Sequence, residues 1–224
     1  MNVSLPSMKP VLTLIRKDLT LEFRRKYALF SMLLYIVATV YISYLVFNRI
    51  EDIKTWNALF WIILVFGSIQ TAGRSFVQES AYRFTFYFHY IRPQWLILSK
   101  VLYNGMLLTL VGFLTWMLFG LLIGNPVKSP GMFSLTLLLA GFGFSGVLTL
   151  VGAIAAKTDQ NATLMAILSI PILLPLLLTL IQTSRMCLTG QSWGDASSFL
   201  LVLGMLNVLI STLGYLLFPY IWRD

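Results

Sequence analysis

The residues of this chain that could do chemistry are few and lie far apart in the sequence. Ser145 lies in the segment GFSG (143–146), a pattern that surrounds the nucleophilic serine of some membrane enzymes. A serine nucleophile needs a base within hydrogen-bond reach. The only histidine, His89, lies in a different segment, and the last apolar stretch contains none. The pattern therefore favours close packing of helices over catalysis.

Metal, redox and nucleotide sites are also poorly supported by the residue types present. His89 and Cys187 are single residues in different loops, so they predict neither a metal cluster nor a disulfide. We interpret His89 as a packing or surface residue, with a haem ligand as the alternative. No GxxxxGK(S/T) phosphate loop is present in the sequence. The interiors of the apolar stretches lack Asp, Glu, Lys and Arg, which argues against a proton-coupled transporter.

The chain is too poor in charged residues for a soluble protein, so the secondary-structure elements that position these residues must lie in a membrane. Hydrophobic residues make up 58% of the 224 residues and charged residues only 11%, whereas a soluble domain is about 25% charged. So few charges cannot coat a soluble fold of this size. One cysteine also excludes a disulfide scaffold, and the hydrophobicity excludes a disordered chain.

Six stretches are long and apolar enough to cross a bilayer as helices, which takes about 20 residues each. The predicted fold class is therefore an all-α membrane protein, with six transmembrane helices in a single domain, 1–224. The predicted spans are 28–47, 56–72, 96–123, 132–156, 162–182 and 199–222.

Loop charges predict the orientation of these spans. Twelve of the sixteen Lys and Arg residues lie in the termini, in the loops after the second and fourth spans and at the foot of the third span. Short basic loops stay in the cytoplasm, so we expect both termini there, in a multi-pass protein of the bacterial inner membrane. This topology explains the net charge of +8, and nucleic acid is not needed as a partner.

The segment before the first span, 10–26, has the pattern of an amphipathic interfacial helix. Val11, Ile15, Leu19 and Phe23 recur every four residues and form an apolar stripe. A basic anchor that only sets topology is the simpler interpretation, and the two are compatible. The residues expected to anchor this segment at the headgroups are Arg16, Lys17, Arg24, Arg25 and Lys26.

The longest cytoplasmic connection, 73–95, is unusually aromatic. It includes the run YRFTFYFHY (82–90), which would be costly to leave in water. The connection must therefore lie on the membrane, pack under the bundle or dock a partner. Aromatic residues with interspersed Arg are typical of interface hot spots, and an interfacial aromatic belt is the simpler alternative.

Two patterns inside the spans concern how the helices pack and bend. Gly141, Ser145 and Thr149 recur every four residues, a spacing of small residues that lets helices approach closely. Pro171 and Pro175 each remove a backbone hydrogen bond from the fifth span. They predict either a static kink, which is the simpler interpretation, or a hinge in a moving transporter.

Six spans, both ends inside and no internal energy source together resemble the type-2 ABC exporter permeases, and within them the CcmB family. Three stretches carry this resemblance. Arg74-x-Phe76-x-x-Glu79 follows the second span, and Lys100 opens the third. The stretch from Leu148 to Leu178 resembles the family's fourth span, short basic loop and double-proline fifth span.

The resemblance implies a permease subunit of a haem exporter for cytochrome c maturation. Its expected partners are an ABC ATPase subunit, which would bind ATP, a haem-handling membrane subunit, a haem chaperone, and a second copy or another subunit that completes the pathway. No cofactor is expected to bind this chain directly. Residues 80–90 depart from the family pattern because they are aromatic and contain no acid. The residues expected to contact the ATPase are Arg74, Phe76, Glu79 and Arg83.

Three other functions remain as alternatives. A type-2 ABC permease for a lipid, drug or polysaccharide predicts the same architecture. A rhomboid-like intramembrane protease, which the segment 143–146 resembles, would need a histidine in the sixth span, and that span has none. A passive scaffold in a maturation complex would need no transport cycle.

Overall fold

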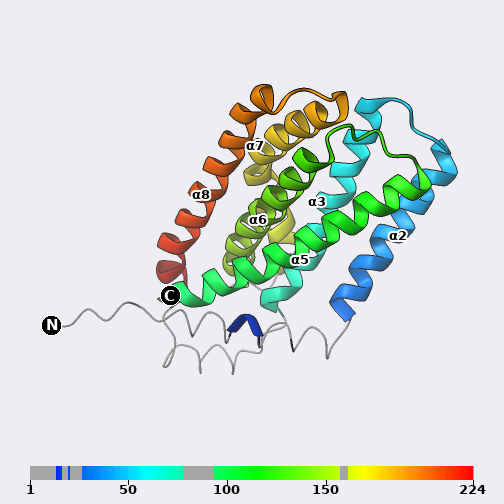
Figure 1. The fold of residues 1–224 in the computed structure, drawn as a ribbon. Helices are drawn as coiled ribbons and strands as arrows, with labels where there is room; N and C mark the ends of the chain where they lie inside the picture. Colours follow the sequence, from blue (N-terminus) through cyan, green and yellow to red (C-terminus); the bar gives the residue numbers. More distant parts are fainter. Residues whose placement is uncertain (1–13, 17–19, 21–26, 78–92, 157–160, 224) are drawn as a thin grey trace.

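The computed structural model describes residues 14–16, 20, 27–77, 93–156 and 161–223. At several helix ends, 71–77 among them, it describes the backbone and not the side chains. Within these ranges the chain forms one bundle of long helices without any β-strand (Figure 1).

Among the described residues six long helices make up this bundle, and each is long and apolar enough to cross a membrane. They are α2 (Tyr27–Phe47), α3 (Ile53–Val77), α5 (Pro93–Leu122), α6 (Pro130–Ala155), α7 (Asn161–Thr189) and α8 (Trp193–Arg223). The predicted all-α membrane fold with six spans is therefore confirmed.

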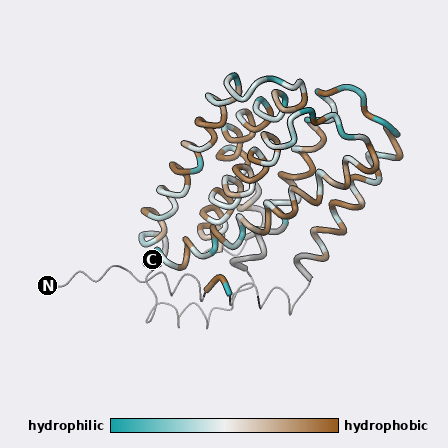
Figure 2. The backbone as a smooth tube through the Cα atoms, in the orientation of Figure 1, coloured by the Kyte–Doolittle hydropathy of each residue, from teal (hydrophilic) through white to brown (hydrophobic). Residues whose placement is uncertain are grey.

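Successive helices run in opposite directions, so their ends gather at two ends of the bundle (Figure 1). We call the end where α2 begins and α8 ends the base, and the opposite end the apex. Hydrophobic residues dominate the helices, while hydrophilic residues gather in the apical connections (Figure 2). This distribution suits helices whose middle parts lie in hydrocarbon.

α6 lies at the centre and packs against α3, α5, α7 and α8 (Figure 1). Most of its residues are buried. Glycines make this crowding feasible, because a Cβ at each would press on a neighbouring helix. The pairs are Gly141 with Thr109 of α5, Gly143 with Leu176 of α7, and Gly146 with Ile210 of α8. The predicted close approach at small residues of this span is confirmed.

The core near the apex is built largely from aromatic rings. Trp56 of α3 stacks on Phe60, with ring centroids 5.2 Å apart. Phe60 also packs against Phe119 of α5 and Phe133 of α6, at centroid distances of 5.6 and 5.5 Å. Trp56 Nε1 donates a hydrogen bond to the carbonyl of Gly124 at 2.9 Å, which ties the α5–α6 connection to α3. The apical half is therefore a densely packed block.

α3 begins with a capping residue at the apex. Asp52 Oδ2 accepts hydrogen bonds from the Thr55 hydroxyl at 2.6 Å and from the Thr55 amide at 3.0 Å. The second of these bonds satisfies an amide of the first helical turn. Both bonds also hold the pKa of Asp52 below its ordinary value, because they stabilise the charged carboxylate.

The helices extend past the predicted spans where polar residues belong to their ends. α7 continues past residue 182 to Thr189. The helix can include Arg185 because this side chain is exposed and long enough to reach the headgroups. Gly190, with a φ of +79°, then ends the helix. α8 begins at Trp193 rather than at 199, since Ser192 and Asp195 cap its first turn through a 2.7 Å hydrogen bond.

The prediction that Cys187 lies in a loop is wrong. Cys187 is fully buried in α7, and its thiol donates to the carbonyl of Thr183 at 3.2 Å. The error follows directly from ending the fifth span at residue 182. In the last turns of α7 the thiol packs as a small apolar group.

Candidate functional site

The first two predicted ATPase-contact residues lie on a helix at the base. α3 continues through Arg74 and Phe76 to Val77, and α5 begins at Pro93. The prediction of a loop over the whole of 73–95 is therefore wrong at both of its ends. Gly73 does not stop α3, because a single glycine costs only about 1 kcal/mol in a helix.

The contacts of the predicted ATPase-binding residues remain predictions. The backbone positions of Arg74 and Phe76 are described, but their side chains are not. Glu79, Arg83 and His89 lie outside the described residues. The structure thus places the start of this segment at the base and tests none of its proposed contacts.

Lys100 lies buried at the base, within the apolar span of α5. Only 2% of its side-chain and backbone surface is exposed, and the adjacent Ser99 is fully buried. Removing an ammonium group from water costs several kcal/mol unless other groups compensate it. The burial of Lys100 within a span makes it a candidate functional residue.

A second hydrophobic cluster at the base joins the N-terminal segment to three spans. Leu14 is buried in this cluster, whereas Arg16, two residues later, is exposed. The Thr20 hydroxyl donates to the Arg16 carbonyl at 2.7 Å, a bond of helical spacing. The cluster consists of Leu14, Leu96, Ile97, Val101, Ala153 and Phe218. The other predicted anchors lie outside the described residues: Lys17, Arg24, Arg25 and Lys26.

Ser145 of the GFSG segment joins two helices. It is fully buried, and its hydroxyl donates to the carbonyl of Val101 in α5 at 2.7 Å. One turn further along, Asn104 Nδ2 of α5 donates to the Thr149 hydroxyl at 3.3 Å. The helix that would supply a catalytic histidine, α8, has none in its sequence. Ser145 therefore has a packing role, as expected, and the protease alternative has no support in this arrangement.

A buried polar cluster in the apical half joins α3 to α7. Trp61 Nε1 donates to the Ser184 hydroxyl oxygen at 2.8 Å, and the Ser184 hydroxyl donates to Asn57 Oδ1 at 2.6 Å. Asn57 Nδ2 completes the cluster by donating to the Ile181 carbonyl at 2.9 Å. We call Asn57, Trp61 and Ser184 the clasp. Hydrogen bonds of this kind hold membrane helices in register.

Sequence reasoning missed the clasp, although one signal was present. Asn57 is an amide within a predicted span, and a polar residue at such a position normally faces the bundle interior. Its partner Ser184 lies in a different helix, 127 residues away. No spacing rule connects residues that far apart, so the pairing could not be read from the sequence.

Toward the base, α7 lacks such attachments along its outward face. Pro171 and Pro175 are inside the helix and exposed. Because proline has no N–H, the carbonyls of Ile167 and Pro171 lose the amide that would normally bond to them. The nearby Ser169 and Thr179 hydroxyls bond to other carbonyls. α7 is thus held firmly to α3 near the apex and is weakened nearer the base.

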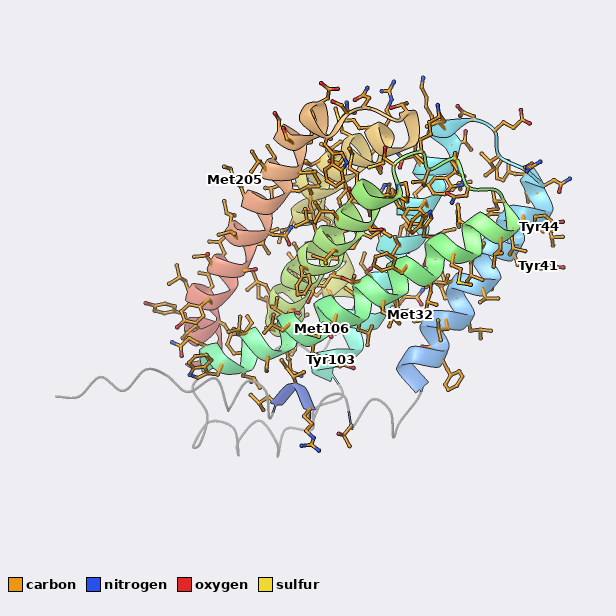
Figure 3. The ribbon with its side chains drawn as sticks, viewed as in Figure 1. Met32, Tyr41, Tyr44, Tyr103, Met106 and Met205 are labelled. Atoms are coloured by element: carbon orange, nitrogen blue, oxygen red, sulfur yellow. The ribbon has the colours of Figure 1, made fainter. Side chains whose placement is uncertain are left out.

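The described residues contain no group of three or more His, Cys, Asp or Glu that could hold a metal ion. Met106 and Met205 each line an outward-facing groove, of about 400 and 450 Å³. The two methionine side chains are labelled in Figure 3. No histidine, cysteine or tyrosine joins either methionine in its groove. Apart from Thr109 the lining side chains are apolar, which suits acyl chains.

The arrangement agrees with a match to a known family. A CcmB protein family model matches residues 9–218, which reach into all six helices and include Arg74, Lys100, Pro171 and Pro175. The chain belongs to the CcmB family. No curated protein matches the sequence. CcmB-family membership identifies a permease subunit of a haem exporter for cytochrome c maturation, which is a multi-pass membrane transporter subunit.

Proposed function

We propose that this chain couples ATP hydrolysis by a separate ATPase subunit to haem handling and to the release of a haem-loaded chaperone. Membership of the CcmB family supports the permease role and the haem-handling partners. The sequence has no phosphate loop of its own, which supports an external energy source. The base would face the cytoplasm of a bacterial inner membrane, since twelve of the sixteen basic residues lie on that side.

The continuity of α3 is the observation that carries the coupling mechanism. This helix runs from Ile53 to Val77 without a break, so Arg74 and the clasp residue Asn57 belong to one rigid element. A push on α3 at the base would therefore displace the clasp, and the clasp would displace α7. Pro171 and Pro175 give α7 a place to bend in response. Docking of the ATPase would thus become a tilt of the spans.

Charge reversal at the base tests the ATPase contact. We expect Arg74→Glu and Glu79→Arg each to lower the amount of ATPase that co-purifies from native membranes several-fold, because charges at a docking rim fix its register. Arg49→Glu makes the same charge change at the apex and should leave the yield unchanged. A haem absorbance spectrum of the same preparation checks the haem partners. Wild-type recovery with both basal variants would show that these two residues do not contact the ATPase.

Restoring the missing amides in α7 tests the hinge. The double variant Pro171→Ala, Pro175→Ala returns two backbone donors and should raise thermal stability, since proline costs up to about 3 kcal/mol within a helix. We expect it also to release several-fold less haem-loaded chaperone per ATP hydrolysed by the complex. Ile172→Ala, an exposed neighbour that keeps its amide, is the control. Increased stability with unchanged release would identify a static kink instead.

A further inference from the structure

One side of the central helix α6 is left uncovered by its neighbours. α5 and α8 meet near the base, where a Cβ at Gly214 would lie 3.5 Å from Ile97 Cδ1, and they spread apart toward the apex (Figure 1). Between them lies a row of α6 residues of which three are exposed and the last is partly exposed. We call this row the α6 strip: Gly131, Leu135, Leu138 and Phe142.

The basal half of the α6 strip forms one wall of a groove. Leu138 and Phe142 line it from α6, and its volume is about 400 Å³. Its other wall consists of four residues of α5: Met106, Thr109, Leu110 and Phe113. The hydroxyl oxygen of Thr109 is buried and lies against Gly141 of α6, so it does not face the groove opening. The groove therefore offers its occupant an apolar surface.

The α6 strip is as long as one leaflet of a membrane. The eleven steps from Gly131 to Phe142 span about 16 Å at 1.5 Å per residue. Half of the roughly 30 Å hydrocarbon layer is about 15 Å. Phe142 lies at the middle of α6 and Gly131 at its apical end. The strip thus runs from the centre of the bilayer to its apical surface.

A cation and an indole ring lie at the apical end of the α6 strip. Lys128 is exposed two residues before α6, and its side chain lies along Gly190 in the connection between α7 and α8. Trp193 is 56% exposed, and its ring would lie 3.6 Å from a Cβ at Gly131. Tryptophan is typical of the membrane–water interface, and lysine near a membrane surface attracts anionic headgroups. This end of the strip therefore suits a phosphate group.

The charge of Lys128 is available to such a group. Lys128 forms no ion pair with any described residue. The acid at the start of α8, Asp195, belongs to the cap of its own helix, where its carboxylate accepts the Ser192 hydroxyl at 2.7 Å. α6 also begins beside Lys128, so the positive end of its dipole adds to the lysine charge.

We propose that the α6 strip binds one glycerophospholipid of the apical leaflet, with an acyl chain in the groove and the phosphate on Lys128. The apolar walls suit a hydrocarbon chain, the length of the strip suits a single leaflet, and Lys128 supplies the complementary charge. A helix of another protein suits the groove less well. Such a helix is about 10 Å across and is normally held by small or polar residues, whereas large apolar side chains dominate these walls.

The bound lipid would fill the space between α5 and α8 and so complete the packing around α6. In the proposed orientation the apical leaflet is the outer leaflet of the inner membrane. The lipid site does not depend on the transport role, because its occupancy and its effect on stability are measured without an ATPase or a haem chaperone.

Lipid-dependent stability tests the chemistry of the site. The full chain is purified in mild detergent, and its thermal unfolding is measured with phosphatidylglycerol, with diacylglycerol and with inorganic phosphate. We expect phosphatidylglycerol to raise the unfolding midpoint by several degrees. Diacylglycerol has the same chains without the phosphate and should act several-fold more weakly, and inorganic phosphate should have no effect. Equal effects of the two lipids would refute the phosphate contact.

Matched variants locate the site, and native mass spectrometry counts the bound phospholipid. Lys128→Gln should lower the affinity for phosphatidylglycerol about fivefold, the contribution of one basic residue near a membrane surface. Lys54→Gln, which removes another exposed apical lysine, should leave the affinity unchanged. Leu138→Trp fills the groove and should remove the bound lipid, whereas Leu34→Trp on the exposed face of α2 should retain it.

Leu110→Trp fills the same groove from α5 and serves as a second blocking variant if Leu138→Trp folds poorly. Retention of the lipid by the blocking variants, or an equal loss in Leu34→Trp, would overturn the proposal. Loss of a co-purified membrane protein from a blocking variant that keeps its phospholipid would assign the groove to that protein instead.

Discussion

Replacing Gly141 with alanine is expected to destabilise the protein by roughly 2 kcal/mol, because it overpacks the crossing of α6 and α5. A Cβ at Gly141 would lie 2.8 Å from the backbone nitrogen of Thr109. A backbone atom cannot rotate away as a side chain can, so the two helices must separate. Separation also stretches the Ser145–Val101 hydrogen bond along the same crossing.

Gly204→Ala is the matched control for this prediction. Gly204 lies in α8, and nothing lies within 4 Å of the position that its Cβ would occupy. Alanine there should be neutral, or stabilising by up to about 1 kcal/mol through its better helix propensity. Thermal unfolding of both variants in the same detergent compares them. Equal midpoints would mean that the close crossing at Gly141 contributes nothing to stability.

Replacing Asn57 with leucine should cost about 1–3 kcal/mol, because it removes the two hydrogen bonds that Asn57 makes within the clasp, each worth about 0.5–1.5 kcal/mol. The Ser184 hydroxyl loses the acceptor at 2.6 Å and keeps only the longer bond to the Ile181 carbonyl, at 3.1 Å. The Ile181 carbonyl loses the Asn57 amide at 2.9 Å. If the clasp transmits motion, ATP hydrolysis by the complex should also become uncoupled from chaperone release.

A double-mutant cycle separates the clasp from simple loss of packing. Asn57→Leu, Ser184→Ala and the double variant should show a coupling of about 0.6 kcal/mol, the average for hydrogen bonds between membrane helices, and of about 1.7 kcal/mol at most. Thr212→Val removes an exposed hydroxyl that bonds only within α8 and should change stability by less than about 0.5 kcal/mol. Additive single effects would indicate that the two side chains act independently.

The architecture was predictable because the bilayer demands long apolar stretches. The number of spans follows from the lengths of the apolar stretches, and the close packing at Gly141 follows from the spacing of its small residues. Helix ends were less predictable, since charge is a poor marker of where a membrane helix stops. Arg185 and Asp195 both lie within helices. The Arg185 side chain can extend to the membrane surface, and Asp195 caps the first turn of α8. The misplacement of Cys187 followed from that rule.

The candidate site was predictable only where it is local in sequence. The proline pair of α7 and the Arg74 segment could be found by inspection, because each lies within a few residues. The clasp, the burial of Lys100 and the presence of Leu14 and Phe218 in one hydrophobic cluster depend on helices brought together by the fold. In the sequence such long-range contacts are indicated only weakly, for example by a single polar residue in an apolar stretch.

The central position of α6 also has a consequence for biosynthesis. α6 is the fourth of the six long helices in the described part of the chain, yet α7 and α8, which are made after it, cover Gly143 and Gly146. While those two helices are still emerging from the ribosome, the grooves beside these glycines must be filled by lipid. The core is therefore complete only after the last two helices are made, and the protein does not assemble from two halves that fold separately. An interrupted chain would leave in the membrane a half-wrapped helix, open to wrong partners and to proteolysis.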